Sequence, residues 1–177
     1  MISRIARITL FAFVALFLSA FLANSGSHPA AKAQPHPDSS DHHCKSVGGS
    51  IITNFGAVDP NTTLGPATGD LRGAVAASLL TPPQPGPMVG GVQTVIFNIQ
   101  HHWVTESGDN IVFAPAVATT VPLSQTRFAF ISYPAQIIGG TGRFAGATGD
   151  LTNIGEADLQ AGTAIRYSGQ VCFADRD

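Results

Sequence analysis

Residues 139–151 read GGTGRFAGATGDL, and this stretch decides more about the fold than any other part of the chain. Glycine supplies the positive φ angles of tight turns, and inside a strand it marks a bulge or a close approach of two backbones. We therefore expect a tight turn over 139–142 and then a strand over 145–152 that runs close to its neighbour. The glycines to which we assign this structural role are Gly139, Gly140, Gly142, Gly146 and Gly149.

A glycine-rich run also suggests a phosphate-binding loop, but the spacing excludes one. The run contains neither G-x-x-x-x-G-K-[ST] nor G-x-G-x-x-G. No helical pattern follows it, so no helix N-terminus is offered to a phosphate. The run is evidence about the backbone and not about chemistry.

The rest of the chain after Val47 predicts an all-β domain. Short apolar and β-branched runs alternate with turn-rich stretches, and no window of helical length repeats every 3.6 residues. The proline-rich segment 82–87 predicts a rigid loop, and 107–110 predicts a hairpin turn. The expected strands are 47–54, 70–80, 92–105, 111–120, 126–133, 145–152 and 163–173, with a weaker one at 155–160.

The longest expected strand, 92–105, has two faces, because side chains alternate along a strand. Its apolar face should point inward and carries His101 and Trp103. By the same alternation Tyr167 points inward from 163–173, and Cys172 points outward. Together with residues on other strands, the candidates for the lining of an internal pocket are His101, Trp103, Arg127, Tyr133 and Tyr167. The alternative for each is an ordinary place in the core or, for Arg127, at a rim.

The N-terminal segment 1–33 predicts an export signal. Two arginines precede an apolar run from Ile8 to Ala23, and Ala-Lys-Ala ends the segment. The run is short for a membrane span, so the expected contact with a membrane is the transient one of a signal; an uncleaved anchor is the alternative. We expect a tail over 34–45, one barrel domain over 46–177, and a secreted or periplasmic location.

Charge argues against nucleic acid as a partner. Without the segment 1–33 the chain keeps 6 basic and 11 acidic residues, a formal charge of −5. Its arginines are scattered singly, whereas binding to DNA requires clustered Lys and Arg.

The two cysteines, Cys44 and Cys172, predict a disulfide. An exported chain meets an oxidising compartment, and the pair lies near the two ends of the expected domain. The alternative, a catalytic thiol, needs a partner base. The histidines and aspartates of the tail, between 36 and 43, could capture a metal, but we interpret the segment as a solvated tail and expect no metal site.

The run GGTGRF at 139–144, followed by Gly146 and Gly149, resembles the late hairpin of plant dirigent proteins and allene oxide cyclases. The similarity extends over about 124–173. It implies a single eight-stranded antiparallel β-barrel with a small hydrophobic cavity, no cofactor, and a homotrimer. Members of this superfamily steer the coupling of phenolic radicals or close a fatty-acid epoxide into a ring. Because the motif is structural, it supports the fold and carries no catalytic residue over to this chain.

Two functions remain open at this point. In the first, the barrel binds or guides a small hydrophobic molecule, as a binder or as a cofactor-free isomerase or cyclase. In the second, it is a non-enzymatic secreted module that acts through its outer surface. A pocket of about 300 Å³ would favour the first, and a filled barrel with a broad apolar outer patch would favour the second.

Overall fold

The computed structural model describes residues 43–175, which are almost entirely β-strand. The expected signal over 1–33 and the expected tail up to residue 42 lie outside the described residues. The first strand begins at His43, so the last residues of the expected 34–45 tail belong to a strand. The elements are β1 (His43–Phe55), β2 (Thr62–Ala67), β3 (Gly73–Leu79), β4 (Gln84–Val89), β5 (Val92–Thr105), β6 (Asn110–Phe113), β7 (Ala116–Pro122), β8 (Arg127–Ser132), β9 (Pro134–Gly140), the 3₁₀ turn η1 (Gly142–Phe144), β10 (Thr148–Asp158) and β11 (Gly162–Phe173).

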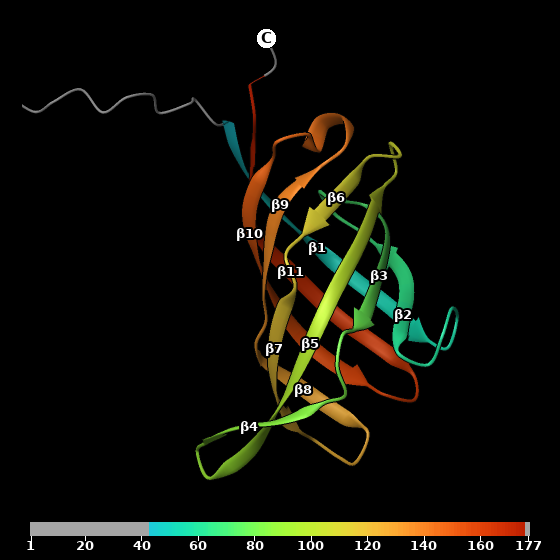
Figure 1. Cartoon of the computed structure of the whole chain (residues 1–177), viewed down its shortest axis with the longest axis vertical. Coiled ribbons are helices and arrows are strands. Elements are labelled where there is room, and N and C mark those ends of the chain that lie inside the picture. Colours follow the sequence, from blue (N-terminus) through green and yellow to red (C-terminus); the bar gives the residue numbers. More distant parts are fainter. Residues whose placement is uncertain (1–42, 176–177) are drawn as a thin grey trace, which may run out of the picture. The chain divides into compact units, whose positions relative to one another are not determined.

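The strands close into an antiparallel barrel of eight wall positions (Figure 1). Strands β6 and β7 share one position, since β6 pairs with the last part of β5 and β7 with its first part. Strands β9 and β8 share the next position, since both pair with β10. The pairings of β11 with β1 and with β10 complete the ring through β1, β2, β3 and β5. The expected eight-stranded antiparallel barrel is confirmed.

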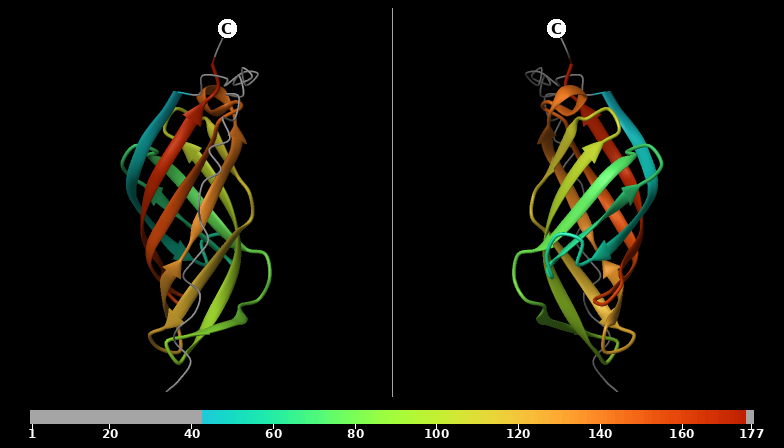
Figure 2. Two further views of the ribbon diagram at one scale, coloured as in Figure 1. Left: turned by 90° about the vertical axis from the view of Figure 1, so that its left-hand side faces the viewer. Right: turned by 90° about the vertical axis from the view of Figure 1, so that its right-hand side faces the viewer.

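Some expected strand limits are wrong. The strands β2 and β9 were not expected, and the separate strands at 145–152 and 155–160 are one strand, β10. The proline-rich segment is not only a loop, because β4 pairs there with the first part of β5. Within the described residues β4 pairs with β5 alone, and an edge strand tolerates the proline residues Pro85 and Pro87. The β4–β5 hairpin projects below the barrel in the side views (Figure 2).

The glycine run forms a turn followed by a strand, as its spacing predicts, but both begin a few residues later than expected. Gly139 and Gly140 end β9, and the turn is the 3₁₀ segment that follows. Gly142 has φ 52°, and a side chain there would meet the carboxylate of Asp109. Gly149 lies in β10, where a Cβ atom would collide with the backbone of β11. The run therefore lets the chain turn and then pass closely along the barrel wall.

The disulfide is confirmed: Cys44 is bonded to Cys172. The two residues are direct partners in the β1–β11 ladder, at the end of the barrel where β1 begins and β11 ends. In Figure 1 that end is uppermost, and the β10–β11 hairpin lies at the lower right. No helix within residues 43–175 has the length and hydropathy to cross a membrane.

The interior divides along the barrel axis. The half near the disulfide is filled by large side chains that are almost fully buried, among them Phe144, Leu151 and Val171. The half near the β10–β11 hairpin contains a cavity. Any internal site is therefore confined to one end of the barrel.

Candidate functional site

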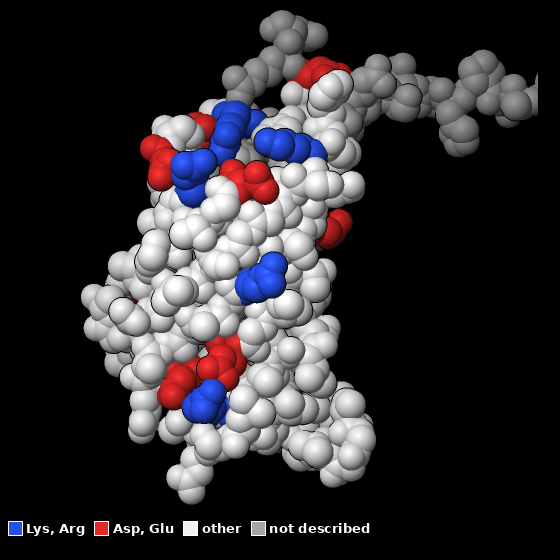
Figure 3. Space-filling view, turned by 180° about the vertical axis from the view of Figure 1, so that it is seen from behind, with Lys and Arg blue, Asp and Glu red and all other residues white. Residues whose placement is uncertain are grey.

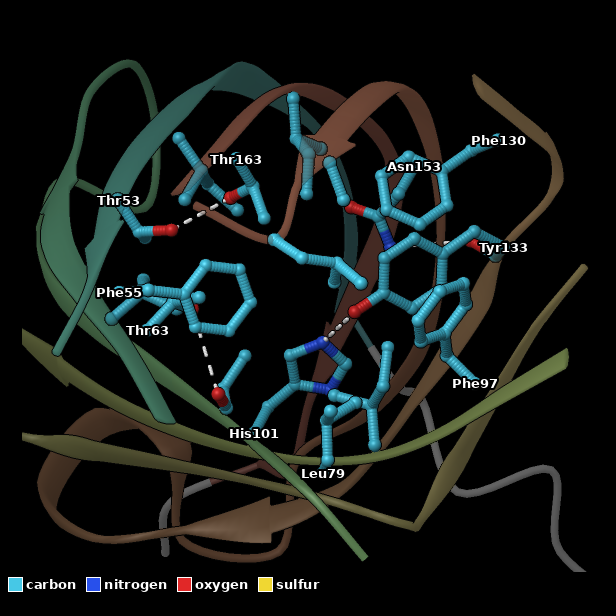
Figure 4. A pocket seen from close by; sticks show the side chains of 17 residues that line it. Thr53, Phe55, Thr63, Leu79, Phe97, His101, Phe130, Tyr133, Asn153 and Thr163 are labelled. Atoms are coloured by element: carbon cyan, nitrogen blue, oxygen red, sulfur yellow. Dashed lines mark hydrogen bonds between the residues drawn. The ribbon is translucent and has the colours of Figure 1, made fainter. Parts of the chain in front are cut away.

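The cavity has a volume of about 50 Å³ and an almost wholly apolar wall. Alternate side chains of β1, β3, β5 and β11 point into it, as strand geometry requires. Phe97 and Ile99 of β5 form part of the wall, and Phe55, Leu79 and Phe130 are only partly buried. Figure 4 shows these side chains around the space, with His101 and Tyr133 facing each other across one side of it.

The size of the cavity limits what can enter it. Its volume is several times the 10–15 Å³ or so that one water molecule needs, and below the roughly 300 Å³ of a drug-sized pocket. The internal pocket of about 300 Å³ that was expected for a binding function is therefore not present within residues 43–175, and the completely filled barrel that would favour the second function is not present either. The space suits a slender apolar group of a few heavy atoms.

His101 and Tyr133 are the polar centre of the cavity wall. The imidazole Nε2 and the phenol oxygen are 2.6 Å apart, and the two rings stack with centroids 5.6 Å apart. The exposed fractions of the side chains are 8% and 3%. The other imidazole nitrogen, Nδ1, is buried and makes no hydrogen bond within the described part of the chain.

The hydrogen-bond inventory favours one tautomer. If Tyr133 donates its O–H to Nε2, neutral His101 carries its proton on Nδ1, and one buried donor lacks a partner. If Nε2–H donates instead, Nδ1 is an unmatched acceptor and the phenol proton must find another acceptor. The first arrangement leaves fewer groups unmatched, so we assign the proton of His101 to Nδ1.

Burial keeps both groups neutral. Desolvation lowers the pKa of His101 to about 4, with a smaller contribution from the nearby His102. Desolvation also raises the pKa of Tyr133 well above its usual range. At neutral pH the pair is therefore an uncharged imidazole and an uncharged phenol, which suits an apolar surrounding.

Tyr133 lies at the junction between β8 and β9, and Asn153 of β10 holds that junction. The backbone N–H of Asn153 donates to the Tyr133 carbonyl at 2.9 Å, and its side-chain amide donates to the same oxygen at 3.2 Å. Asn153 also lines the cavity. Sequence reasoning missed this residue, because its strand was expected to end at 152.

A second polar pair lies in the cavity wall. The hydroxyls of Thr53 and Thr163, on the paired strands β1 and β11, are 2.7 Å apart and satisfy each other. They leave His101 Nδ1 as the buried side-chain polar atom without a partner among residues 43–175. Neither threonine was expected at the site.

Trp103 and Tyr167 point inward as expected, but they belong to the filled half of the barrel. Trp103 Nε1 donates to the Leu71 carbonyl at 2.8 Å. The Tyr167 hydroxyl donates to the Thr68 carbonyl at 2.8 Å and accepts from the Leu71 N–H at 3.0 Å. Neither side chain lines the cavity. Both hold the segment between β2 and β3 against the core.

Arg127 does not face the interior. Its guanidinium makes two hydrogen bonds to the carboxylate of Glu156, at 2.9 and 2.7 Å, on the outer wall. Both side chains are largely exposed, at 49% and 40%. Of the five expected pocket residues, only His101 and Tyr133 line the cavity, while Trp103 and Tyr167 contact each other in the filled half.

Residues 43–175 contain no group of three or more His, Cys, Asp or Glu side chains placed to hold a metal ion. Most of the tail cluster considered from the sequence lies before residue 43. Figure 3 shows one face on which charged side chains gather mainly toward the two ends, with a basic side chain also in the middle of the otherwise uncharged surface between them.

The similarity of this chain to known proteins is found among solved structures. No family model and no curated protein matches the sequence. A solved structure of the pterocarpan synthase dirigent protein GePTS1 is similar to this chain, with 14% identity and a TM-score of 0.35, over 82% of this chain and 98% of that one. The antiparallel β-barrel itself follows from the strand pairings of this chain. At this level of similarity we draw nothing about activity from the relative.

Proposed function

We propose that this barrel binds a small hydrophobic molecule in the cavity beside His101 and Tyr133. The observation that carries the proposal is an apolar cavity whose wall contains a buried nitrogen, His101 Nδ1, without a partner in residues 43–175. Buried polar groups are nearly always satisfied, and an exception is explained by strain, a catalytic role, or a bound water, ion or ligand. The apolar wall supplies affinity, and the polar group supplies orientation.

The partly buried rings at the edge of the cavity define how a ligand would enter. Phe55 and Phe130 are half-buried, and the Phe130 ring packs against the Tyr133 ring with centroids 4.8 Å apart. A ligand larger than the present 50 Å³ would displace these side chains while the strands stay in place. The ligand class is therefore a compact apolar molecule, such as a single ring or a short chain.

A catalytic form of the same role is a cofactor-free isomerase or cyclase. Among the lining residues, the His101–Tyr133 pair carries exchangeable protons at hydrogen-bond distance from each other. Binding and guiding need only the shape of the cavity, whereas catalysis would also need this pair to move a proton.

A cavity-filling variant tests the binding proposal. Ala157 of β10 lines the cavity and is 6% exposed, so Ala157→Leu should fill part of the space. Ala164→Leu, on the exposed outer face of β11, is the matched control. We expect small phenols or methyl esters of short fatty acids, which are uncharged, to raise the Tm of the wild type and of Ala164→Leu, and to leave that of Ala157→Leu unchanged. Absence of any shift with the wild type across such a panel would overturn the proposal.

We also propose that the protein is exported. The disulfide between Cys44 and Cys172 supports this, since such bonds persist in oxidising compartments. N-terminal sequencing of the natural protein should find residues 1–33 removed. Retention of Met1 would contradict both the cleavage and a soluble exported form.

A second candidate function rests on the outer wall. Val104 of β5, Val112 of β6 and Ile138 of β9 are 42%, 45% and 53% exposed on neighbouring strands. Exposed apolar side chains on adjacent strands favour contact with another protein surface, including a second copy of this chain. Light scattering at increasing protein concentration tests this: a homotrimer that Val112→Lys dissociates supports it, and a monomer at all concentrations contradicts self-association.

A further inference from the structure

The hydrogen-bonding groups in the cavity wall indicate which polar group a ligand should carry. The proposed binding function assigns the site to a hydrophobic molecule without distinguishing a hydrocarbon from a molecule with an oxygen. His101 makes that distinction, because only one of its two ring nitrogens is satisfied by the protein.

We infer that His101 Nδ1–H is the anchor for a hydrogen-bond acceptor on the ligand, so that the site selects compact apolar molecules that carry one carbonyl or ether oxygen. The inference rests on the proposed binding function and adds the polarity of the ligand to it. Tyr133 fixes the orientation of the anchor, since its hydroxyl occupies Nε2 and leaves the proton on Nδ1. In this role Tyr133 is a positioning residue.

The surroundings of His101 favour a neutral acceptor over an anion. Phe113 and Tyr133 flank the imidazole, with ring centroids 5.4 and 5.6 Å away. No Asp, Glu, Lys or Arg side chain lines the cavity. A charged ligand would lose its hydration without gaining an opposite charge, whereas a ketone or ether oxygen loses little and gains one hydrogen bond.

The strand supplies a natural control. His102 follows His101 in β5 but points to the exposed outer face. His101→Leu removes the donor at similar volume, and His101→Asn keeps an N–H donor near the position of Nδ1. His102→Leu removes a histidine from the same strand without touching the cavity.

The test compares two ligands of nearly equal shape, cyclopentanone and methylenecyclopentane, by NMR titration of the Ile51 and Ile99 methyl groups in the cavity wall. Since the two ligands differ in hydrophobicity, the quantity of interest is the ratio of their affinities in each variant. We expect His101→Leu to lower the ratio of ketone to hydrocarbon affinity by about tenfold, the effect of one hydrogen bond to a buried donor. His101→Asn and His102→Leu should keep most of the wild-type preference for the ketone.

The outcomes separate the two proposals. If both ligands bind and the ratio is the same in the wild type and in His101→Leu, the anchor is wrong and the binding function stands. If neither ligand binds the wild type, nor any member of the panel of phenols and fatty-acid methyl esters, the binding function fails and the anchor with it.

A measurement on the wild type alone keeps the inference testable if His101→Leu does not fold. The ¹⁵N shifts of His101 should identify a neutral ring protonated at Nδ1, and cyclopentanone should move the Nδ1–H proton downfield. A ring protonated at Nε2 would overturn the inference.

Discussion

The Nε2 atom of His101 and the hydroxyl of Tyr133 lie 2.6 Å apart in the wall of an apolar cavity. The two residues come from β5 and from the β8–β9 junction, on opposite sides of the barrel position shared by β6 and β7. Their contact fixes the protonation of His101 and leaves its second nitrogen unpaired. The ligand preference that we propose follows from that one contact.

The buried imidazole should make stability depend on pH. His101 has a pKa of about 4 in the folded protein, and about 6.5 is expected in the unfolded chain. Between these values the unfolded state binds more protons, so the free energy of unfolding rises with pH. From pH 4 to pH 7 the gain attributable to His101 is about 3 kcal/mol. Urea unfolding should show the stability advantage of the wild type over His101→Leu shrinking by this amount as pH falls to 4.

The exposed neighbour provides the control for this pH effect. His102→Leu should keep most of the pH dependence of the wild type, since burial is the larger cause of the lowered pKa of His101 and is unchanged in that variant. If the free energies of unfolding of the wild type and of His101→Leu changed in parallel with pH, His101 would not be buried in its neutral form.

Tyr167 should matter for stability and not for ligand binding. Tyr167→Phe keeps the ring but removes a hydroxyl that serves both the Thr68 carbonyl and the buried Leu71 N–H. We expect the free energy of unfolding to fall by about 2 kcal/mol, because the buried Leu71 N–H loses its acceptor. Trp103, the single tryptophan of the chain, packs edge-on against Tyr167 and reports unfolding by fluorescence.

The adjacent Ser168 gives the matched comparison. It lies on the outer face of the same strand, and Ser168→Ala should lower the free energy of unfolding by less than about 0.5 kcal/mol. If Tyr167→Phe abolished ligand binding at unchanged stability, the residue would belong to the site after all.

Reduction of the disulfide should lower stability and leave the cavity intact. The bond joins residues 128 apart in sequence, and the chain-entropy estimate for such a loop is about 5 kcal/mol. Cys44 and Cys172 lie at one end of the β1–β11 ladder, and Thr53 and Thr163 in the cavity wall lie near the other. Unfolding with and without reductant should differ by about 2–5 kcal/mol. Equal affinities for cyclopentanone before and after reduction, below the unfolding transition, would confirm the separation.

The exposed ion pair should contribute little. Arg127→Gln removes the two hydrogen bonds to Glu156, and surface pairs of this kind contribute about 0–1 kcal/mol. Calorimetry should find the Tm nearly unchanged and ligand affinity unaffected. A large loss of affinity would place Arg127 at the site despite its outward orientation.

The inner rows of β5 and β11 could be predicted because side chains alternate regularly along β11 and along β5 from Phe97 onward. His101, Trp103 and Tyr167 are buried as this alternation requires. The disulfide could be predicted for a simpler reason: the chain has only two cysteines.

Arg127 was misplaced because the alternation is reset between β8 and β9. Phe128 and Phe130 point inward from β8, and then Tyr133 and Ala135 point inward from the junction and β9. Arg127 and Tyr133 share the same parity in sequence, which would put them on the same face of a single uninterrupted strand. The break before Pro134 puts them on opposite faces, and the proline itself was the available signal.

The resemblance implied a small hydrophobic cavity, but its position and volume could not be predicted, because they depend on how side chains from six or more distant strands fill the space together. The same inward rows produce a filled half around Trp103 and a hollow half around His101. Only the packed structure distinguishes them.

The central claim is that the hollow half of the barrel is a ligand site, and methyl NMR during a titration with cyclopentanone tests it most directly. Ile51 and Ile99 line the cavity, whereas Ile138 and Val112 lie on the outer wall. We predict saturable shifts at Ile51 and Ile99 with the outer methyl groups unmoved. Shifts confined to the outer wall, or no saturable shift at Ile51 and Ile99, would contradict the account.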